Sequence, residues 1–426
     1  MKKSLFSFSI ALVAIAVTII GCQNIFINST PQTNSEKVTV KLSGWGASPT
    51  EQKLLKQVLQ GFETGNPGIK VKYEEISDQY MDVIKTRLIG DAAPDVFYLD
   101  GLEAPFLMSQ NVLEPLNGYI TPEFDLSDFQ PVLLNSFKYN DRIYGLPKDY
   151  STLALFYNLK AFTEAGLEKP PATWDELRLY SRKLTTYDNK NNKIKRYGFG
   201  ETLELARQAY KIKAFDGRIV DKSGNAVFAS QSGLKGLQLV VDQYIRDRSS
   251  VQKTDVGTNS GSEMFGQGKV AMAIEGNWAI PYLQETYPQL KFATAEVPRI
   301  NGKAGTMAFT VAYVMNKQTK HKPEAWKLIS YLTGKEGMKK WTSKGFALPS
   351  RKSVAQKLGY EQDPLRSALV AGVNYATPWE VGKYPAAIVN SFDNQFLSAM
   401  LGEQSLEQAM VRAQNTANKQ IQMMEY

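Results

Sequence analysis

The chain has 426 residues, of which 43% are hydrophobic and 22% charged, with one cysteine, one histidine and a formal net charge of +8. This composition is typical of a globular protein that is long enough for two or three domains and needs neither disulfides nor metal to build its core. Because the chain has only one cysteine and one histidine, the composition excludes disulfide scaffolds, cysteine zinc sites, histidine metal sites and histidine-dependent triads. The basic residues are dispersed and do not cluster with aromatic residues, so no nucleic-acid partner is predicted.

The N-terminus is predicted to be an export signal. Lys2 and Lys3 precede a mostly apolar run over residues 5–20, which is too short to span a bilayer. Residues 19–22, Ile-Ile-Gly-Cys, resemble a bacterial lipobox, in which the cysteine is lipidated and becomes the mature N-terminus. We expect a lipoprotein signal peptide over 1–21, with lipidated Cys22 and a flexible tether over 22–37. The alternative is an ordinary signal peptide with an incidental cysteine.

The folded part is predicted to begin with a strand, a helix and a second strand. Alternating apolar residues predict strands over 38–42 and 69–73, and apolar positions at helical spacing predict a helix over 51–63. Asn-Pro-Gly at 66–68 ends this helix. The order indicates a βαβ unit and a mainly parallel sheet.

Further elements follow the same pattern. Short apolar runs predict strands over 95–99 and 270–274. Thr173 and Glu176 have the spacing of a capping box, Pro323 is suited to a first helical turn, and Ser405 is suited to cap a long C-terminal helix.

No catalytic or cofactor motif is complete. A GxGxxG pattern that starts at Gly198 has Leu203 in place of its third glycine, and a calcium-loop pattern that starts at Asp188 has Lys193 where glycine is needed. We therefore predict no catalytic residue, no cofactor and no metal. A pair of carboxylates for glycoside hydrolysis remains open, because two such acids need not be close in sequence.

Several segments, taken together, resemble the bacterial extracellular solute-binding proteins of sugar ABC transporters, the maltose/trehalose-binding type. The segments that carry this resemblance, in the family's order, are 62–71, 93–100, 112–116, 144–147, 155–158, 171–177 and 265–278. The resemblance covers nearly all of the chain after the tether. It implies a binding protein and not an enzyme.

The resemblance implies an α/β fold of the periplasmic-binding-protein type II, with two lobes, a hinge and a ligand cleft between the lobes. We expect lobe 1 to contain 38–147 and 304–350, and lobe 2 to contain 148–303 and 351–426. The chain is expected to cross the hinge near 145–150, 300–306 and 346–352. The lobes would close around the ligand.

The ligand contacts implied by position in the family combine aromatic faces with polar groups. They are Trp45, Gly46, Glu51, Asp100, Asp149, Tyr157, Gly276, Asn277, Trp278, Phe309, Arg351 and Trp379. Asp100 could instead cap a helix, Tyr157 could belong to the core, Arg351 could lie at the surface, and Gly46 could serve only the loop. The other tryptophans, Trp174, Trp326 and Trp341, are predicted to be packing residues.

One departure from the family concerns residues 305–310. Many relatives have Gly-Gly-Trp there, whereas this chain has Gly-Thr-Met-Ala-Phe-Thr, so the usual aromatic wall is either missing or replaced by Phe309. We expect a small neutral glucoside such as trehalose, sucrose or a glucosylated polyol. The expected partners are this sugar, ABC permease subunits and, through the lipid, a membrane; the protein itself is expected to be an extracytoplasmic monomer. The alternatives are a binding protein for a charged solute such as a polyamine, and a lipid-anchored glycoside hydrolase.

Overall fold

The computed structural model describes residues 37–46, 49–188 and 190–425. The predicted signal peptide, Cys22 and the predicted tether up to residue 36 lie outside the described residues. Residues 37–426 form one compact unit. Within the described part of the chain, no helix combines the length and the apolar character needed to cross a membrane.

Strands and helices alternate at the start of the unit, and short helices and a small hairpin follow. These elements are β1 (Val38–Gly44), α1 (Pro49–Gly65), β2 (Ile69–Glu75), α2 (Tyr80–Ile89), β3 (Val96–Asp100), α3 (Ala104–Ser109), η1 (Pro122–Phe124), η2 (Leu126–Asp128), α4 (Pro131–Asn135), β4 (Lys138–Tyr139) and β5 (Arg142–Ile143). Here η1 and η2 are 3-10 helices of one turn each.

The middle of the chain runs between two long strands, β6 and β12. Its elements are β6 (Gly145–Asn158), α5 (Leu159–Glu164), α6 (Trp174–Leu184), β7 (Thr186–Tyr187), β8 (Ile194–Glu201), α7 (Leu205–Ala214), α8 (Gln231–Val241), η3 (Asp242–Arg246), β9 (Ser250–Gln252), η4 (Lys253–Val256), α9 (Gly261–Gly266), β10 (Val270–Gly276), α10 (Ala279–Thr286), β11 (Phe292–Ala295) and β12 (Thr306–Met315).

The C-terminal part is mainly helical. It contains α11 (Lys322–Thr333), α12 (Lys335–Thr342), α13 (Lys352–Leu358), α14 (Ser367–Gly372), β13 (Ala376–Pro378), α15 (Pro385–Met400) and α16 (Leu406–Glu425).

The predicted βαβ unit is confirmed. β1 and β2 pair in parallel from Val38–Ile69 to Gly44–Glu75, and α1 connects them. The buried residues of α1 are the ones that the helical spacing selects: Leu54, Leu55, Val58, Leu59 and Phe62. The periodicity of the sequence therefore identified both the element types and the buried face.

The predicted helix caps are also present. The Glu176 N–H donates to Oγ1 of Thr173 at 3.2 Å, and Oε2 of Glu176 accepts from the Thr173 N–H at 3.3 Å. At the start of α16, the Gln408 N–H donates to Oγ of Ser405 at 3.2 Å. Pro323 lies in the first turn of α11, where a missing amide hydrogen costs nothing.

The prediction of a mainly parallel sheet is wrong, because the sheet is mixed. Its main path runs β2-β1-β3-β12-β6-β10-β8-β7. The pairs β1–β2, β1–β3 and β8–β10 are parallel, whereas β12 is antiparallel to both β3 and β6, and β6 is antiparallel to β10. Hydrophobic periodicity locates strands but does not tell in which direction each one runs in the sheet.

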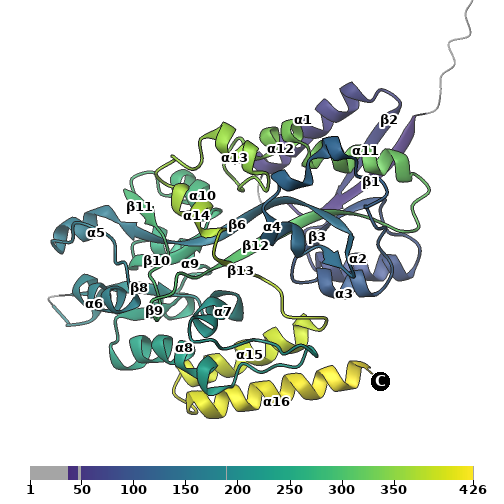
Figure 1. Ribbon diagram of the computed structural model, residues 1–426. Coiled ribbons are helices and arrows are strands. Elements are labelled where there is room, and N and C mark those ends of the chain that lie inside the picture. The colour runs from purple at the N-terminus through teal and green to yellow at the C-terminus, as the bar shows by residue number, and fades with distance from the viewer. Residues whose placement is uncertain (1–36, 47–48, 189, 426) are drawn as a thin grey trace, which may run out of the picture. The chain divides into compact units, whose positions relative to one another are not determined.

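The strands β6 and β12 connect two of the three hydrophobic cores formed by the described residues. The first core holds the buried residues of β1, β3, α1 and α11, and the second holds those of β8, α7, α15 and α16. In β6, Leu146 packs in the first core and Leu153 in the second; in β12, Val314 packs in the first and Met307 in the second. Figure 1 shows the two strands side by side between the element groups around β1 and around β10.

Candidate ligand-binding site

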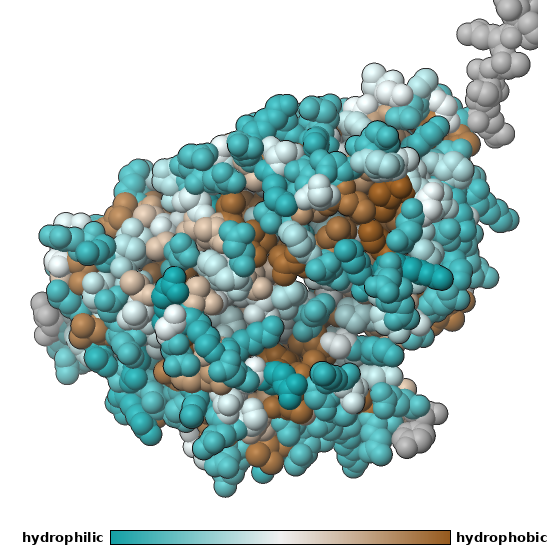
Figure 2. Space-filling view, viewed as in Figure 1, coloured by the Kyte–Doolittle hydropathy of each residue, from teal (hydrophilic) through white to brown (hydrophobic). Residues whose placement is uncertain are grey.

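Three of the predicted contact residues form a row of aromatic rings, here called the aromatic row. The ring centroids of Trp278 and Phe309 lie 5.8 Å apart, and those of Phe309 and Trp379 lie 6.5 Å apart. Trp278 follows β10, Phe309 belongs to β12 and Trp379 follows β13, so tertiary folding brings them together. Trp278 is 37% exposed, and the other two rings are half-buried. On the face that Figure 2 shows, the surface is largely hydrophilic and hydrophobic residues gather in separate patches.

Gly276 and Asn277 hold Trp278 in position. A Cβ at Gly276 would lie 2.2 Å from the Trp278 ring, so a side chain there would displace the indole. Asn277 is fully buried: its N–H donates to Oγ of Ser151 and its Nδ2 to the carbonyl oxygen of Gly345, both at 2.8 Å. The structure thus places Asn277 as a support beneath the site rather than as a surface group.

Two charged residues that the sequence analysis did not identify lie beside Trp278. Nε1 of Trp278 donates to Oε2 of Glu275 at 3.0 Å. The guanidinium carbon of Arg207 lies 4.9 Å from the Trp278 ring centroid and 5.4 Å from that of Phe309. Glu275 directly precedes Gly276 and could have been found from that position. Arg207 belongs to α7, and no motif marked it.

These residues line a pocket of about 380 Å³, here called the Arg207 pocket. The other residues around it are Thr202, Glu204, Lys253, Ser260, Gly261, Ser262 and Tyr282. Nη2 of Arg207 lies 3.8 Å from Oε2 of Glu275, and Nζ of Lys253 lies 3.0 Å from Oε1 of Glu204. Two cations are therefore matched by two carboxylates, and the charges of the pocket cancel.

A second pocket, of about 450 Å³, lies at the Trp379 end of the row. Its lining combines Pro105 of α3, which precedes β6 in the chain, with Trp379 and its neighbours, which follow β12. Asp100 ends the neighbouring strand β3, and the N–H of the next residue, Gly101, donates to the Thr310 carbonyl at 3.0 Å. The structure therefore places Asp100 near this end of the row.

The Asp100 carboxylate is poorly solvated. Oδ1 accepts from the Leu102 N–H at 2.8 Å, which is the capping contact considered as its alternative role. Desolvation by burial raises the pKa of Asp100 to about 6; the Leu102 N–H opposes this shift and the charge of Glu103 adds to it. Part of the carboxyl population is therefore protonated in mildly acidic solution.

Trp45, Gly46 and Glu51 lie together around the start of α1. The Trp45 ring packs edge-on against Tyr80 and Tyr98, with centroid distances of 4.9 and 5.3 Å. A Cβ at Gly46 would lie 2.8 Å from the Glu75 carboxylate. Burial raises the pKa of the Tyr73 hydroxyl, and the charges of Glu75 and Glu51 raise it further. This group forms a polar and aromatic surface on the first core.

Asp149 is already paired within the protein. Its Oδ2 forms an ion pair with Nζ of Lys148 and accepts a hydrogen bond from Nε1 of Trp341 at 2.6 Å. The Lys148 ammonium lies 4.1 Å from the Trp341 ring centroid, and Asp149 is 7% exposed. The structure places Asp149 beneath the surface, where its charge is neutralised by Lys148.

The placement of Arg351 contradicts the alternative of a surface arginine, and the protein itself uses most donors of the guanidinium that was expected to contact the ligand. Arg351 is 1% exposed. Its guanidinium donates to the carbonyl oxygens of Thr333, Asp125 and Phe124 at 2.7, 3.0 and 2.9 Å, and to Oδ2 of Asp128 at 3.3 Å. The guanidinium carbon lies 4.7 Å from the Phe124 ring centroid and 4.1 Å from that of Phe129. We call this group the Arg351 nest; it joins the η1–η2 segment to α11.

Tyr157 does not join the aromatic row. Tyr157 lies in β6, and its partner in the neighbouring strand β10 is Met272. Trp278 follows the other end of β10, where Gly276 pairs with Leu153. Tyr157 therefore lies at the end of β10 that is away from Trp278. Its ring centroid is 4.7 Å from that of Phe162, a buried residue of the second core. The placement favours the alternative in which Tyr157 is a packing residue.

The three remaining tryptophans pack as predicted. Trp174 is 3% exposed in the second core and Trp341 is 5% exposed in the first. Trp326 packs against Tyr119 and Phe124, at centroid distances of 5.8 and 5.6 Å.

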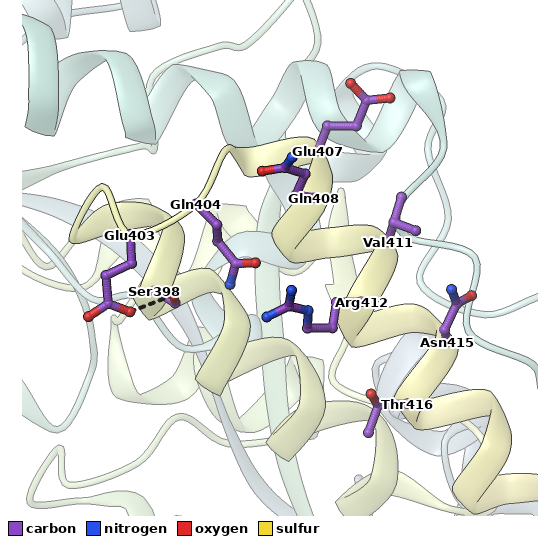
Figure 3. Close-up of a pocket in the computed structure, with 9 residues that line it drawn as sticks. All are labelled: Ser398, Glu403, Gln404, Glu407, Gln408, Val411, Arg412, Asn415 and Thr416. Atoms are coloured by element: carbon purple, nitrogen blue, oxygen red, sulfur yellow. Dashed lines mark hydrogen bonds between the residues drawn. The ribbon is translucent and has the colours of Figure 1, made fainter.

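A larger hollow, of about 920 Å³, lies between α15 and α16 (Figure 3). Its lining is polar except for Val411, and Oγ of Ser398 donates to Glu403 at 2.7 Å across its rim. No aromatic ring lines it, so it lacks the flat apolar faces of the aromatic row. Among the described residues, no cluster of His, Cys, Asp and Glu side chains is placed to hold a metal ion.

Comparisons with known proteins agree on one family. The model of the family described as bacterial extracellular solute-binding protein matches residues 46–339. A Brucella abortus protein named only as a binding protein is 28% identical over 307 residues, which cover 71% of this chain and 73% of that protein. The multiple sugar-binding protein of Streptococcus mutans is 26% identical over 322 residues, covering 73% of this chain and 74% of the relative.

A solved structure shares the whole fold. It is an ABC substrate-binding protein from Listeria monocytogenes in complex with cycloalternan, with a TM-score of 0.80 and 23% sequence identity. The superposition covers 90% of this chain and 99% of that chain.

Proposed function

The chain belongs to the bacterial extracellular solute-binding protein family, and we propose that it captures a neutral sugar or small glucoside and delivers it to the permease of an ABC importer. As a member of this family it is a solute-binding protein and not an enzyme. The fold class predicted from the sequence, the mixed α/β fold of periplasmic binding proteins, is confirmed by the likeness to the Listeria structure. The sugar and the permease are the parts that we propose.

The observation that carries the proposal is the aromatic row of Trp278, Phe309 and Trp379. Sugars present weakly apolar C–H faces and a rim of hydroxyl groups, so they are bound by flat rings together with a few placed polar groups. The row supplies the rings, and Glu275 and Arg207 supply an acceptor and a donor beside the exposed Trp278. Two similar proteins support a carbohydrate ligand: one is named a multiple sugar-binding protein, and the other was solved in complex with cycloalternan.

The charges near the row favour a neutral sugar over a polyamine. The polyamine alternative rested on three acids, Glu51, Asp100 and Asp149. Asp149 is neutralised by Lys148, and the pocket beside Trp278 contains cations as well as carboxylates. A polycation would meet Arg207 and Lys253 there. We therefore keep trehalose, sucrose and a glucosylated polyol as the first ligands to try.

We further propose that capture occurs by closure of two lobes, 38–147 with 304–350 and 148–303 with 351–426. Support comes from the two hydrophobic cores and from the passage of β6 and β12 between them. Val354 packs in the first core, which favours a third crossing slightly after residue 351. Hinge closure around a ligand is a common transition in such folds.

The proposal is tested by titration calorimetry and thermal unfolding with trehalose, sucrose, maltotriose and putrescine. A ligand that binds the folded state raises its stability by RT ln(1 + [L]/Kd), so a hundredfold excess over Kd gives about 2.7 kcal/mol. We expect at least one of the sugars to bind and putrescine not to bind. Binding of putrescine alone, or of none of the four, would contradict the sugar assignment.

The lipid anchor on Cys22 is a separate proposal, based on the sequence alone. A lipid and a tether would hold the protein, as a monomer, near the permease and raise its effective concentration there. Cys22→Ser should abolish labelling by a radioactive fatty acid and release the protein from membranes. Its sugar affinity in solution should equal that of the unmodified chain. Membrane retention of Cys22→Ser would argue for another anchor.

A further inference from the structure

Arg207 is a shielded cation whose hydrogen-bond donors are not used. Its side chain is 14% exposed, and a guanidinium carries five N–H donors. None of them donates a hydrogen bond to a described residue, and Nη1 is shielded from solvent without a partner in the described part of the chain. The nearest carboxylate oxygen, Oε2 of Glu275, lies 3.8 Å from Nη2, which is too far for a hydrogen bond. A desolvated donor without an acceptor is costly, so such a group calls for a partner.

The position of Arg207 is well defined in spite of its free donors. It lies in the first turn of α7, whose Leu205 N–H donates to Oδ1 of Asp393 on α15 at 2.7 Å. The guanidinium lies over the rings of both Trp278 and Phe309. Cation–π contact of this kind orients the charged plane without using its N–H groups. The donors therefore remain available beside the aromatic row.

The surrounding charges identify the chemistry of the partner. Glu275 lies beside Arg207, and Oε2 of Glu275 accepts hydrogen bonds from Trp278 and from Oγ of Ser262 at 3.0 and 3.1 Å. Lys253 is paired with Glu204 across the same pocket. An anionic ligand group would be repelled by Glu275, and a cationic group by Arg207. Hydroxyl groups, which both accept and donate, suit a neighbouring guanidinium and carboxylate.

We propose that Arg207 is a specificity-determining residue that recognises the hydroxyl groups of a neutral sugar in the Arg207 pocket. Its N–H groups donate to a hydroxyl oxygen of the sugar unit that lies against Trp278, and Glu275 accepts from an adjacent hydroxyl. This inference rests on the proposed function. It adds two points to that function: Arg207 contacts a sugar hydroxyl group, and the pocket excludes sugar acids.

The test compares Arg207→Gln and Arg207→Lys with Arg182→Gln. Arg182 is an exposed arginine of α6 that pairs with Asp247, so its replacement controls for the loss of one positive charge. Calorimetric Kd values are measured for whichever of trehalose, sucrose and maltotriose the unmodified protein binds. We expect tenfold to hundredfold weaker binding for Arg207→Gln, since a hydrogen bond to a charged group is lost, and a smaller loss for Arg207→Lys, which keeps the charge but not the planar fork. Arg182→Gln should bind as the unmodified protein does.

Thermal unfolding without sugar separates this role from a structural one. Arg207→Gln removes a cation that makes no hydrogen bond, and Glu275 keeps its hydrogen bonds from Trp278 and Ser262, so the melting temperature should stay within a few degrees of the original. A large fall in melting temperature together with weaker binding would overturn the proposal in favour of a packing role. Unchanged affinity in Arg207→Gln, with sugar binding intact in the unmodified protein, would overturn the proposal and leave the sugar-binding function standing. Failure of the unmodified protein to bind any sugar would overturn both.

Glucuronic acid and glucose form a second arm of the test. At equal concentration in competition with the bound sugar, glucose should displace it at least as well as glucuronic acid. Stronger displacement by glucuronic acid, lost in Arg207→Gln, would mean that Arg207 binds a carboxylate and would overturn the assignment to neutral hydroxyl groups.

Discussion

The Arg351 nest and the Arg207 pocket each place a guanidinium against two aromatic rings, but they use its donors differently. Arg351 lies over Phe124 and Phe129 and donates four hydrogen bonds to protein oxygens. Arg207 lies over Trp278 and Phe309 and donates none to a described residue. The same side chain in a similar ring environment can therefore be part of the scaffold or part of a site.

The difference shows which observation separates a structural charge from a functional one. Burial alone does not, because both side chains are largely shielded, at 1% and 14% exposed. What distinguishes them is whether the protein itself satisfies the donors. A satisfied buried arginine rigidifies the fold, whereas unsatisfied donors beside an exposed indole remain available to a ligand.

The largest effect is expected from Arg351→Gln. This change removes the partner of Asp128, whose side chain is 8% exposed, and leaves the carbonyl oxygens of Phe124, Asp125 and Thr333 without their donor. Loss of one partner of a buried ion pair typically costs about 3–5 kcal/mol. The free energy of unfolding, measured by urea denaturation, should fall by about this amount. The sugar affinity of the protein that remains folded should not change.

Arg351→Lys gives the matched control for this prediction. Lysine keeps the positive charge but not the planar fork, so it should recover only part of the lost stability. If the urea concentration at which half of Arg351→Gln is unfolded equals that of the unmodified protein, the nest does not stabilise the fold. If it weakens sugar binding without loss of stability, the original expectation of a ligand contact is restored.

Trp278→Ala should mainly affect binding. The substitution removes the exposed ring of the aromatic row, and loss of a stacking or well-placed polar contact costs about 1–3 kcal/mol, or about fivefold to 150-fold in Kd. Calorimetry with the sugar found in the screen measures this loss, and circular dichroism checks that the fold is retained.

Trp326→Ala is the control tryptophan because it packs beside Phe124 of the Arg351 nest. It should lower the melting temperature and leave Kd unchanged, the reverse of Trp278→Ala. Equal losses of affinity in the two variants would mean that the aromatic row is not the site.

The smallest effect concerns two carboxylates, that of Asp128 in the Arg351 nest and that of Asp100 near the Trp379 end of the aromatic row. Asp128 accepts hydrogen bonds from Arg351 and from the N–H and hydroxyl of Ser353, whereas the Leu102 N–H donates the one hydrogen bond that a described residue makes to the Asp100 carboxylate. Burial raises the pKa of Asp100 to about 6. The folded state therefore binds a proton more tightly than the unfolded chain does. The resulting penalty on stability is absent below about pH 3, grows between the two pKa values, and is nearly complete above about pH 6.5, where the carboxylate is charged in both states.

Asp100→Asn should remove this penalty, because asparagine can still accept from the Leu102 N–H. Its free energy of unfolding should match that of the unmodified protein near pH 3 and exceed it by about 2–3 kcal/mol at pH 7.5. Urea denaturation at several pH values measures the difference. A constant difference across the range, or a destabilised variant at pH 7.5, would contradict the raised pKa.

Much of the fold could be predicted from local patterns. The helix over 51–63, the capping box at Thr173 and the βαβ start all follow from spacings within a few residues, and all three are confirmed. The prediction of a mainly parallel sheet failed because β6 and β12 run antiparallel to each other and connect the two cores. The direction of a strand depends on its partners, which are distant in sequence.

The site was predicted in part, and the reason lies in how its residues are arranged. Trp278 was found because it ends a segment that resembles the family, Phe309 because it lies where many relatives have a tryptophan, and Trp379 as a further possible stacking face; the structure brings the three rings together. Arg351 was predicted to contact ligand from a similar position, yet the structure buries it in the nest. Arg207 was missed because it occupies a helix turn without a motif.

The sequence by itself determined the family, the element types, the helix caps and the candidate aromatic residues, since each depends on residue type and short spacing. Only the tertiary structure decided which charged groups are satisfied by the protein and which are not. Satisfaction depends on oxygen atoms contributed by remote segments: Thr333 and Asp125 supply them to Arg351, while the nearest carboxylate stays 3.8 Å from Arg207. A hydrogen bond is lost when the distance between donor and acceptor grows by a few tenths of an ångström. Packing sets atomic positions to that precision, and the spacing of residues in the sequence does not.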